Sequence, residues 1–339
     1  MFLHLRYFPF WTTAFYLTFN RSIISSLSNT KLWILFVLRC YKLLLADPDN
    51  CMKVGLGVDA LCFAKEVFVK RKKTKLSPKG NFFFTVGVMF KNERGVMKEW
   101  LDHYLFHGVD HVFMINDGSD DDFQEVLRPY IDSSFVTLFD STSFPRFSGR
   151  QFLIYDLFLL SKQSEVEWMA LLDMDEFLYS PNDIDLKNVI KFYSDFSQII
   201  VSWLVFSSND LLEQPFSVVS GFTKRASPEK FDYVSCRKSI VKMKFLKRFA
   251  IHRHVASGNV VNVSFGDGQA SSSLLINHYY VQSKEYWEKK KVPGGSANQF
   301  SKFKKRSLDL FNKFNVSDVE DLRLYEQNKE IIEKLKSQK

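Results

Sequence analysis

The sequence predicts an α/β fold in which a mixed, mostly parallel sheet is flanked by helices. From residue 82 onward, short apolar runs rich in β-branched and aromatic residues alternate with segments whose apolar residues recur every three or four positions. This alternation is typical of a parallel sheet with helices on both faces. Hydrophobic residues make up 46% of the 339 residues, which is enough for the core of one large domain.

The first two strand–helix pairs lie between residues 82 and 130. "FFFTVGVMF" (Phe82–Phe90) predicts a strand, and apolar residues at helical spacing over 93–108 predict a helix after it. "HVFMIN" (His111–Asn116) predicts the second strand. A second helix then follows, with Asp121 or Asp122 as its N-terminal cap.

The third and fourth strands continue the series. "FVTLF" (Phe135–Phe139) predicts the third strand, and "WMALL" (Trp168–Leu172) predicts the fourth, after a long helix over 149–162. Beyond them the pattern becomes mixed, with a strand predicted at 198–206 and further runs at 238–246 and 273–280 before a charged, helical C-terminus. In such sheets ligands bind beyond the carboxyl ends of the strands, so we expect the site where the first, second and fourth strands end.

Three segments are expected: a basic and aromatic N-terminal extension of helical character (1–80), the sheet domain (81–295) and a helical tail (296–339). Residues 1–80 hold 13 Lys and Arg against 4 Asp and Glu, a net charge of +9, so the rest of the chain carries −1 of the total +8. The positive charge is densest at Lys70–Lys75, away from the expected site. This distribution argues against nucleic acid as a partner and favours peripheral contact with an anionic membrane.

The expected location is the cytoplasm, with the extension either packed on the sheet domain or bound peripherally to a membrane. The apolar stretches Tyr7–Phe19 and Leu32–Leu38 are shorter than the about 20 residues that a spanning helix needs. Four cysteines without a CxxC pair indicate a reducing compartment. The alternative is the secretory pathway (Golgi), with Tyr7–Phe19 as a short anchor.

The fourth predicted strand runs directly into three carboxylates, in the stretch "WMALLDMDEFLYS". Asp173, Asp175 and Glu176 would repel one another at the end of an apolar strand unless a positive charge lay beside them. An Asp-x-Asp pair at a strand end can bind Mn²⁺ or Mg²⁺, which take oxygen ligands and bridge phosphates. With a nucleotide-sugar, the cation would neutralise the leaving diphosphate.

Two other functions fit the same acids. In a phosphatase or phosphotransferase Asp173 would be the nucleophile, although such enzymes usually have a hydroxyl residue where Phe177 stands. A non-catalytic carbohydrate-binding protein on the same scaffold is the other alternative, but without a metal it gains nothing from clustered acids. A calcium loop is excluded because Leu178 stands where glycine is needed.

Polar residues at the other strand ends are further candidates. Asp117 either accepts a hydrogen bond from a base or ribose or belongs to a turn before the next helix. Asn92 and Glu93 follow the first strand, where Glu93 is alternatively a charge at a helix N-terminus. His278 is a metal ligand if its strand returns beside Asp175, and otherwise a buried core residue.

Several long blocks carry a resemblance to a known family. "KNERGVMKEWLDHYLFHGVDHVFMINDGSDDD", "WMALLDMDEFL", "WLVFSSND", "RKSIVKMKFLKRFAIH" and "NHYYVQSKEYWEKKKVPGG" occur in this order between residues 91 and 295. In order and spacing they resemble glycosyltransferase family 92 (the DUF23 type). The resemblance implies a GT-A fold related to the family 2 transferases, a UDP-linked hexose as donor with galactose as the first choice, and inversion at the anomeric carbon. It further implies a carbohydrate or glycoconjugate acceptor and Mn²⁺ (or Mg²⁺) as the cofactor.

The resemblance also implies a role for each matching residue. The nucleotide-sugar would be bound by Asn92, Glu93, Asp117, Asp173, Lys238 and His252. The metal would be bound by Asp173, Asp175 and His278. Trp203 and Ser208 would face the sugar or the acceptor. The plainer alternatives are that Trp203 is a bulky residue of the sheet and that His252 is an ordinary polar position on a strand.

An inverting enzyme needs a carboxylate that takes the proton from the acceptor hydroxyl. Asp210 and Glu213 lie in the loop expected near the acceptor, and Asp210 is the first choice beside Asp175 as a catalytic residue. The loop sequence "FSSND" departs from the family's "FGSSG"-like loop, and Met243 stands where the family often has proline. The resemblance therefore implies no particular acceptor.

Overall fold

The computed structural model describes residues 82–144, 150–227, 237–250, 252–263, 272–293 and 306–338. All of them belong to the unit Lys79–Lys339. The predicted N-terminal extension, with its membrane contact and its anchor, lies outside the described residues. Within the described part, none of the helices combines the length and the apolarity needed to cross a bilayer.

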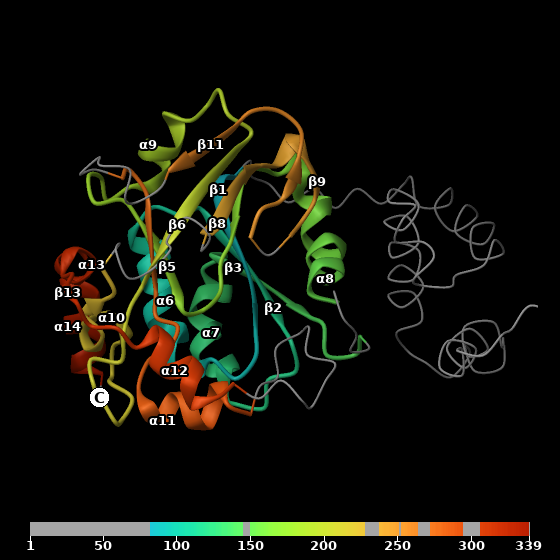
Figure 1. The fold of residues 1–339 in the computed structure, drawn as a ribbon. Helices are drawn as coiled ribbons and strands as arrows, with labels where there is room; N and C mark the ends of the chain where they lie inside the picture. The colour runs from blue at the N-terminus through green and yellow to red at the C-terminus, as the bar shows by residue number, and fades with distance from the viewer. Residues whose placement is uncertain are drawn as a thin grey trace, which may run out of the picture. The chain divides into compact units, whose positions relative to one another are not determined.

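A nine-stranded sheet forms the centre of this unit (Figure 1). The strand order is β3-β2-β1-β4-β8-β6-β12-β5, and β11 also pairs with β6. Five of the eight pairings are parallel. The strands are β1 (Phe82–Phe90), β2 (His111–Asn116), β3 (Val136–Asp140), β4 (Val166–Leu171), β5 (Glu176–Tyr179), β6 (Gln198–Val205), β8 (Arg237–Lys242), β11 (Val260–Val263) and β12 (Leu275–His278). The predicted fold class, a mixed and mostly parallel sheet flanked by helices, is therefore confirmed.

Helices cover both faces of the sheet. They include α6 (Arg94–Phe106), α7 (Phe123–Asp132), α8 (Arg150–Leu159), α9 (Leu186–Lys191) and α10 (Val218–Gly221). Alternate residues of β1 face different helices, because successive side chains of a strand point to opposite faces. Val86 and Val88 belong to the core cluster that contains the apolar face of α6, whereas Gly87 faces α8. A Cβ atom at Gly87 would lie 2.9 Å from Leu159 Cδ1 and 2.6 Å from Leu171 Cδ2, so glycine permits this close approach of α8.

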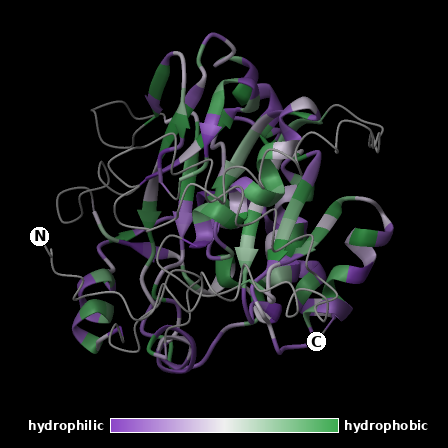
Figure 2. Cartoon of the chain, turned by 90° about the vertical axis from the view of Figure 1, so that its right-hand side faces the viewer, coloured by the Kyte–Doolittle hydropathy of each residue, from purple (hydrophilic) through white to green (hydrophobic). Residues whose placement is uncertain are grey.

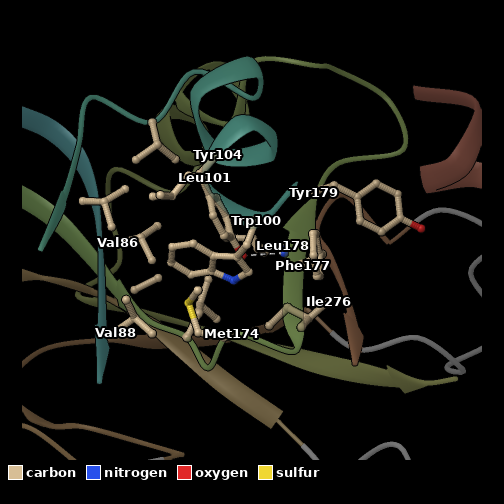
Figure 3. Close-up of a cluster of buried hydrophobic side chains, with 14 of the residues drawn as sticks. Val86, Val88, Trp100, Leu101, Tyr104, Met174, Phe177, Leu178, Tyr179 and Ile276 are labelled. Atoms are coloured by element: carbon tan, nitrogen blue, oxygen red, sulfur yellow. Dashed lines mark hydrogen bonds between the residues drawn. The ribbon is translucent and has the colours of Figure 1, made fainter. Parts of the chain in front are cut away.

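The core beneath the predicted site is centred on α6. Trp100, Leu101 and Tyr104 are fully buried, and Figure 3 shows the Trp100 indole among side chains of β1, β5 and β12, including Val88 and Ile276. The central strands are largely hydrophobic along their length (Figure 2). A sheet buried on both faces has this property, which explains why its strands were recognisable as continuous apolar runs.

The C-terminal part packs on the same unit. Its elements are α11 (Lys284–Tyr286), η3 (Trp287–Lys291), α12 (Leu308–Phe314), α13 (Arg323–Gln327) and α14 (Lys329–Ser337), while β13 (Val319–Glu320) pairs with β7 (Lys224–Arg225). Asn328, between α13 and α14, contacts two buried histidines, His103 of α6 and His107 directly after this helix. Its Oδ1 lies 2.9 Å from His107 Nε2 and its Nδ2 lies 3.1 Å from His103 Nδ1. The described tail is thus helical and docked on α6.

Two departures from the predicted elements concern strands that carry site residues. The apolar run 238–246 divides into β8, a 3₁₀ turn at Met243–Phe245 and β9 (Leu246–Arg248), which pairs with β10 (Val255–Ala256). Glu176, the last of the three acids, begins β5, which no periodicity predicted because all four of its residues are buried.

The prediction that Asp121 or Asp122 caps α7 is confirmed for Asp122, which occupies the cap position although its side chain makes no capping hydrogen bond. Asp121 Oδ2 accepts a hydrogen bond of 2.9 Å from the N–H of Arg94, at the start of α6. The side chain of Asp121 therefore supports the preceding helix.

Candidate active site

The acidic residues lie at the edge of the sheet where the parallel strands end. β4 ends just before Asp173, and β12 ends at His278. Because β5 runs antiparallel to β12 and starts at this edge, Glu176 is the register partner of His278. β8 runs antiparallel to β4 and β6, so its first residues, including Lys238, lie at the same edge. Four strands therefore bring acids, a histidine and a lysine together.

Asp175, Glu176 and His278 form a candidate metal site. All three are buried, and one ligand atom from each lies within 4.8 Å of the others. His278 Nε2 lies 3.6 Å from Asp175 Oδ1. The strand that carries His278 does return beside Asp175, which was the condition for His278 as a ligand. The third member of the cluster is Glu176, however, and not Asp173.

Asp173 borders this cluster rather than belonging to it. Its side chain is 40% exposed, and its Oδ2 lies 2.8 Å from Lys238 Nζ. The N–H of Asp173 donates a hydrogen bond of 2.9 Å to Glu176 Oε2, so the glutamate side chain closes the acidic turn. The carboxylate of Asp173 is consequently the acid of the three that is most accessible from solvent.

Two buried lysines compensate the negative charge. Lys238 Nζ lies 3.2 Å from Glu176 Oε2 as well as near Asp173, and Lys291 Nζ lies 2.6 Å from Asp175 Oδ2. Burial alone would raise the pKa of Asp175, but Lys291 and His278 outweigh it and hold that pKa far below its usual range. Burial likewise disfavours the charged form of Lys238, but Asp173 and Glu176 outweigh it and raise the Lys238 pKa. Asp175 and Lys238 are therefore charged at neutral pH.

Glu176 is the acid that these lysines neutralise least. Burial, the largest influence, raises the pKa of Glu176 to about 8, although Lys238 acts against it. Its Oε1 is buried and has no hydrogen-bond partner among the described residues. A buried carboxylate oxygen without a partner is costly, and a cation would satisfy it. The two carboxylates fit Mn²⁺ or Mg²⁺ in ligand type, and the imidazole favours the transition metal over Mg²⁺.

Two aromatic residues of α6 form hydrogen bonds to the backbone of the acidic turn (residues 173–176). The sequence pattern did not predict these contacts. Trp100 Nε1 donates to the backbone oxygens of Asp173 and Glu176, at 3.1 Å and 3.0 Å. The Tyr104 hydroxyl donates to Glu176 O at 2.9 Å and accepts from the N–H of Leu178 at 2.9 Å. Trp and Tyr at helical spacing indicated only a core face, because the partner atoms belong to a segment more than 70 residues away.

Asn92 and Glu93 lie at the end of β1, as predicted. Asn92 has a positive φ of 54° and joins two loops: its N–H donates to Ser119 Oγ at 3.0 Å and its Oδ1 accepts from the N–H of Asp120 at 2.8 Å. Glu93 Oε1 pairs with Lys290 Nζ at 3.0 Å. Burial raises the pKa of Glu93 even though Lys290 and Lys291 act against it.

Asp117 is buried at the end of β2 and engaged with α8. Its Oδ1 lies 2.5 Å from Arg150 Nη1 and accepts a hydrogen bond of 3.3 Å from Ser141 Oγ. The turn after β2 is closed by Asn116, whose Oδ1 accepts from the N–H of Ser119 at 2.8 Å. The turn role considered for Asp117 thus falls to its neighbour. A nucleotide contact of Asp117 remains a prediction.

Trp203, Lys238, His252 and His278 are brought together beside the cluster. The Trp203 ring centroid lies 4.4 Å from that of His278 and 5.5 Å from that of His252, and Lys238 Nζ lies 5.9 Å from the Trp203 ring. His252 is exposed, and its Nδ1 lies 3.3 Å from Arg237 O. The sheet thus places a half-buried indole directly next to the candidate metal site.

Ser208 and Asp210 lie in the loop after β6. Ser208 is buried: its N–H donates to Asn315 Oδ1 at 2.7 Å, and its Oγ accepts from the N–H of Asp210 at 3.2 Å. Asp210 is exposed, with a positive φ of 59°. Among the described contacts, none joins the Asp210 carboxylate to the acidic cluster. Its role as general base remains a prediction.

A cavity of about 270 Å³ lies beside Asn92 and Glu93. It lies between the start of α6, the loop before α10 and the α11–η3 segment. Residues that line it include Glu93, Gly95, Gln214, Gln282 and Tyr286. No pattern in the sequence indicated this cavity, because its walls come from three distant segments.

The model of glycosyltransferase family 92 matches residues 81–323. The chain belongs to glycosyltransferase family 92. This membership confirms the predicted resemblance and places the chain in a family of transferases.

Relatives are similar over only part of their length. A family 92 protein of Oryza sativa subsp. japonica is 28% identical over 215 residues, which are 60% of this chain and 34% of the relative. A galactan beta-1,4-galactosyltransferase of Arabidopsis thaliana, GALS3, is 30% identical over 118 residues, which are 33% of this chain and 23% of the relative. The chain thus spans about a third or less of the length of these curated relatives.

One solved structure with some similarity is S. aureus TarS 1–349 in complex with UDP-GlcNAc. It shares 12% sequence identity and a TM-score of 0.33, over 55% of this chain and 60% of that chain. A similarity this low indicates nothing about the function of this chain.

Proposed function

We propose that this protein is a metal-dependent glycosyltransferase that transfers a hexose from a UDP-sugar to a hydroxyl of a carbohydrate or glycoconjugate acceptor. The observation that carries the proposal is the buried cluster of Asp175, Glu176 and His278 at the carboxyl edge of the sheet of a family 92 protein. Galactose is the first choice for the hexose, supported by the similarity to galactan beta-1,4-galactosyltransferases.

The residues that would hold the cation are Asp175, Glu176 and His278. Bound Mn²⁺ or Mg²⁺ supplies neutralisation of the diphosphate as it leaves. Asp173, with its exposed carboxylate, would approach the cation from the solvent side.

Lys238 and Lys291 support binding of the diphosphate. With Glu176 protonated, the two carboxylates of Asp173 and Asp175 balance the two ammonium groups of Lys238 and Lys291, which offsets part of the cost of burying these charges. A diphosphate entering this site offers both ammonium groups further oxygen acceptors, and an ammonium group can donate three hydrogen bonds. The lysines would thus bind the leaving group while the carboxylates hold the cation.

Trp203 would hold the donor sugar. Its half-buried indole lies against His278 and within reach of Lys238, so a sugar attached to the diphosphate would extend over an aromatic surface. The flat ring also excludes water from the anomeric carbon, which favours transfer over hydrolysis. The proposal also includes inversion of configuration at the anomeric carbon, with Asp210 as the base that takes the proton from the acceptor hydroxyl.

The test is hydrolysis and transfer with UDP-galactose, UDP-glucose, UDP-GlcNAc and a GDP-sugar in Mn²⁺. We expect a UDP-hexose to be turned over, and Asp175→Asn to lose roughly 10²–10³-fold in kcat, as for removal of one group that stabilises a transition state. Asp132→Asn is the matched control, because Asp132 is an exposed acid at the end of α7. Equal turnover of wild type and Asp175→Asn would refute the metal role. Turnover of aryl phosphates with no need for a nucleotide-sugar would instead support the phosphatase alternative.

A further inference from the structure

The cavity beside α6 borders the candidate metal site. Lys290, in its wall, pairs with Glu93 at 3.0 Å, and the next residue, Lys291, pairs with Asp175 at 2.6 Å. Lys291 Nζ also lies 5.6 Å from the ring centroid of Tyr286, which lines the cavity. A ligand in the cavity would therefore lie next to a donor bound at the acidic cluster.

The walls of the cavity carry no excess charge. Glu93 pairs with Lys290 at 3.0 Å, and Glu285 pairs with Lys289 at 2.6 Å. Each acid that lines the cavity thus has a lysine that also lines it. This balance disfavours an anionic group such as a diphosphate and suits a neutral ligand.

The remaining polar groups are amides arranged around an aromatic ring. Gln214 Nε2 donates to Gln282 Oε1 at 2.6 Å. Gln282 is 1% exposed, and its amide lies beside the Tyr286 hydroxyl. Such amide groups can donate hydrogen bonds to the hydroxyls of a ligand and accept hydrogen bonds from them. A flat ring beside amide groups is the combination that binds a sugar ring, whose faces are apolar and whose edges are hydroxylated.

One residue of the wall has a strained backbone. Gln282 has a φ of 51°, in the left-handed region that disfavours most residues other than glycine, whereas Asn92, with a φ of 54°, is of a residue type that tolerates this region. Such conformations persist only where the surrounding structure enforces them, and they cluster at ligand sites. The shape of this wall is therefore held at some cost to stability.

We propose that this cavity binds one neutral sugar residue of the acceptor, next to the donor site. The inference rests on the proposed function, since it assigns the second substrate of the same reaction. The volume of about 270 Å³ lies below the roughly 300–1,000 Å³ of sites for drug-sized ligands, which fits one hexose ring better than a nucleotide.

Gly95 offers a way to fill the cavity without disturbing the fold. A Cβ atom built on Gly95 meets nothing within 4 Å, and the residue lies in the first turn of α6. Leucine also favours a helix more than glycine does. We therefore expect Gly95→Leu to fold with an unchanged or higher melting temperature while its side chain occupies the cavity. Gly95→Ala, which adds only one methyl group, is the matched control.

The experiment uses the full chain, with β-1,4-linked galactotetraose as the sugar probe and UDP with Mn²⁺ as the nucleotide probe. Binding is measured by saturation-transfer NMR and by calorimetry. We expect wild type to bind the tetrasaccharide, Gly95→Ala to bind it no more than about twofold more weakly, and Gly95→Leu to bind it at least about tenfold more weakly. The dissociation constant for UDP should change by less than about twofold in both variants.

Three outcomes would overturn the inference. The first is unchanged tetrasaccharide binding by Gly95→Leu. The second is binding of UDP but of no tetrasaccharide by wild type. The third is loss of UDP binding in Gly95→Leu, which would assign the cavity to the nucleotide. Failure of the proposed function looks different, because wild type would then bind no UDP and turn over no UDP-hexose whatever happens at Gly95.

Discussion

Three acids within four positions avoid mutual repulsion in three different ways. Asp173 keeps 40% of its side chain exposed, and Asp175 is held charged by Lys291 and His278. Glu176 is fully buried, and burial raises its pKa to about 8. At neutral pH the folded protein therefore favours a proton on Glu176, which a cation at this site would displace.

The raised pKa of Glu176 predicts a stability that falls with rising pH. Between its ordinary pKa of 4.5 and about 8, the unfolded chain has released this proton while the folded chain retains it. Because the folded state then binds more protons, the free energy of unfolding decreases as pH rises through this window. With EDTA present, we expect Glu176→Gln to remove a decrease of a few kcal/mol between pH 5 and pH 8.5.

Urea denaturation of wild type and Glu176→Gln at the two pH values measures this difference. Other titrating groups are common to both proteins and cancel in the comparison. Asp175 does not contribute within the window, because its pKa is lowered and its stabilisation is lost only as pH falls below its ordinary value of 3.8. Parallel pH dependence in the two proteins would show that Glu176 is not protonated in the folded state.

Asp210 makes a separate prediction at the residue scale. If it is the base, Asp210→Asn should lower kcat for transfer by roughly 10²–10⁴-fold with little effect on hydrolysis of the donor, since the base acts on the acceptor. Glu213→Gln, in the same exposed loop, is the matched variant. A loss confined to Glu213→Gln would move the role to that residue, and loss in neither would exclude this loop.

At the scale of elements, α6 is the platform of the site. Its first turn contributes to the cavity, Trp100 and Tyr104 bind the backbone of the acidic turn, and Glu99 accepts hydrogen bonds from Ser217 and Val218 at the start of α10. One helix thus positions the metal ligands and the wall of the cavity together. Loss of a contact from its buried face should affect binding as well as stability.

Tyr104→Phe tests this platform. The change leaves Glu176 O without the hydroxyl donor and the N–H of Leu178 without its acceptor, both buried, at a cost of about 1–3 kcal/mol. We expect that loss in urea denaturation, together with weaker binding of Mn²⁺ and UDP, because the turn that carries Glu176 is less fixed. Tyr325→Phe, at a half-buried tyrosine of α13, is the control. A stability loss with unchanged Mn²⁺ binding would show that α6 supports the fold only.

At the scale of the whole molecule, the excess positive charge and the candidate active site lie in different parts of the sequence. The net charge of +9 belongs to residues 1–80, whereas the family model begins at residue 81. The described tail is docked on α6 through Asn328. We therefore expect a role of the extension at a membrane to be independent of the site.

Deletion of residues 1–80 should abolish flotation with vesicles that contain phosphatidylserine while leaving turnover of the UDP-sugar unchanged. The basic block Lys70–Lys75 is expected to supply about 1 kcal/mol per charge near the anionic surface, so flotation of the full chain should also fall with salt. Replacing the lysines and the arginine of the block by glutamine provides a variant with the full length. Flotation that survives the deletion would contradict the membrane proposal, and an anchor at Tyr7–Phe19 would leave flotation insensitive to salt.

Much of the sheet was predictable because its strands are apolar along their whole length. The predicted strands Phe82–Phe90 and His111–Asn116 agree with β1 and β2 residue for residue. β5 was missed since four buried residues after a turn have no distinguishing period. The run 238–246 received no assignment, since the 3₁₀ turn that ends β8 within it has no glycine or proline to mark it.

The amino-acid sequence by itself determined the strand series, the family and the place of the acids at a strand end, since these depend on local pattern and on order along the chain. Tertiary structure alone decided which groups meet there. Lys291 reaches Asp175 across 116 residues, and Lys238 reaches Asp173 across 65. The physical reason is that burial and distance between remote segments set which carboxylate is paired and which is protonated, and neither quantity exists until the chain has folded.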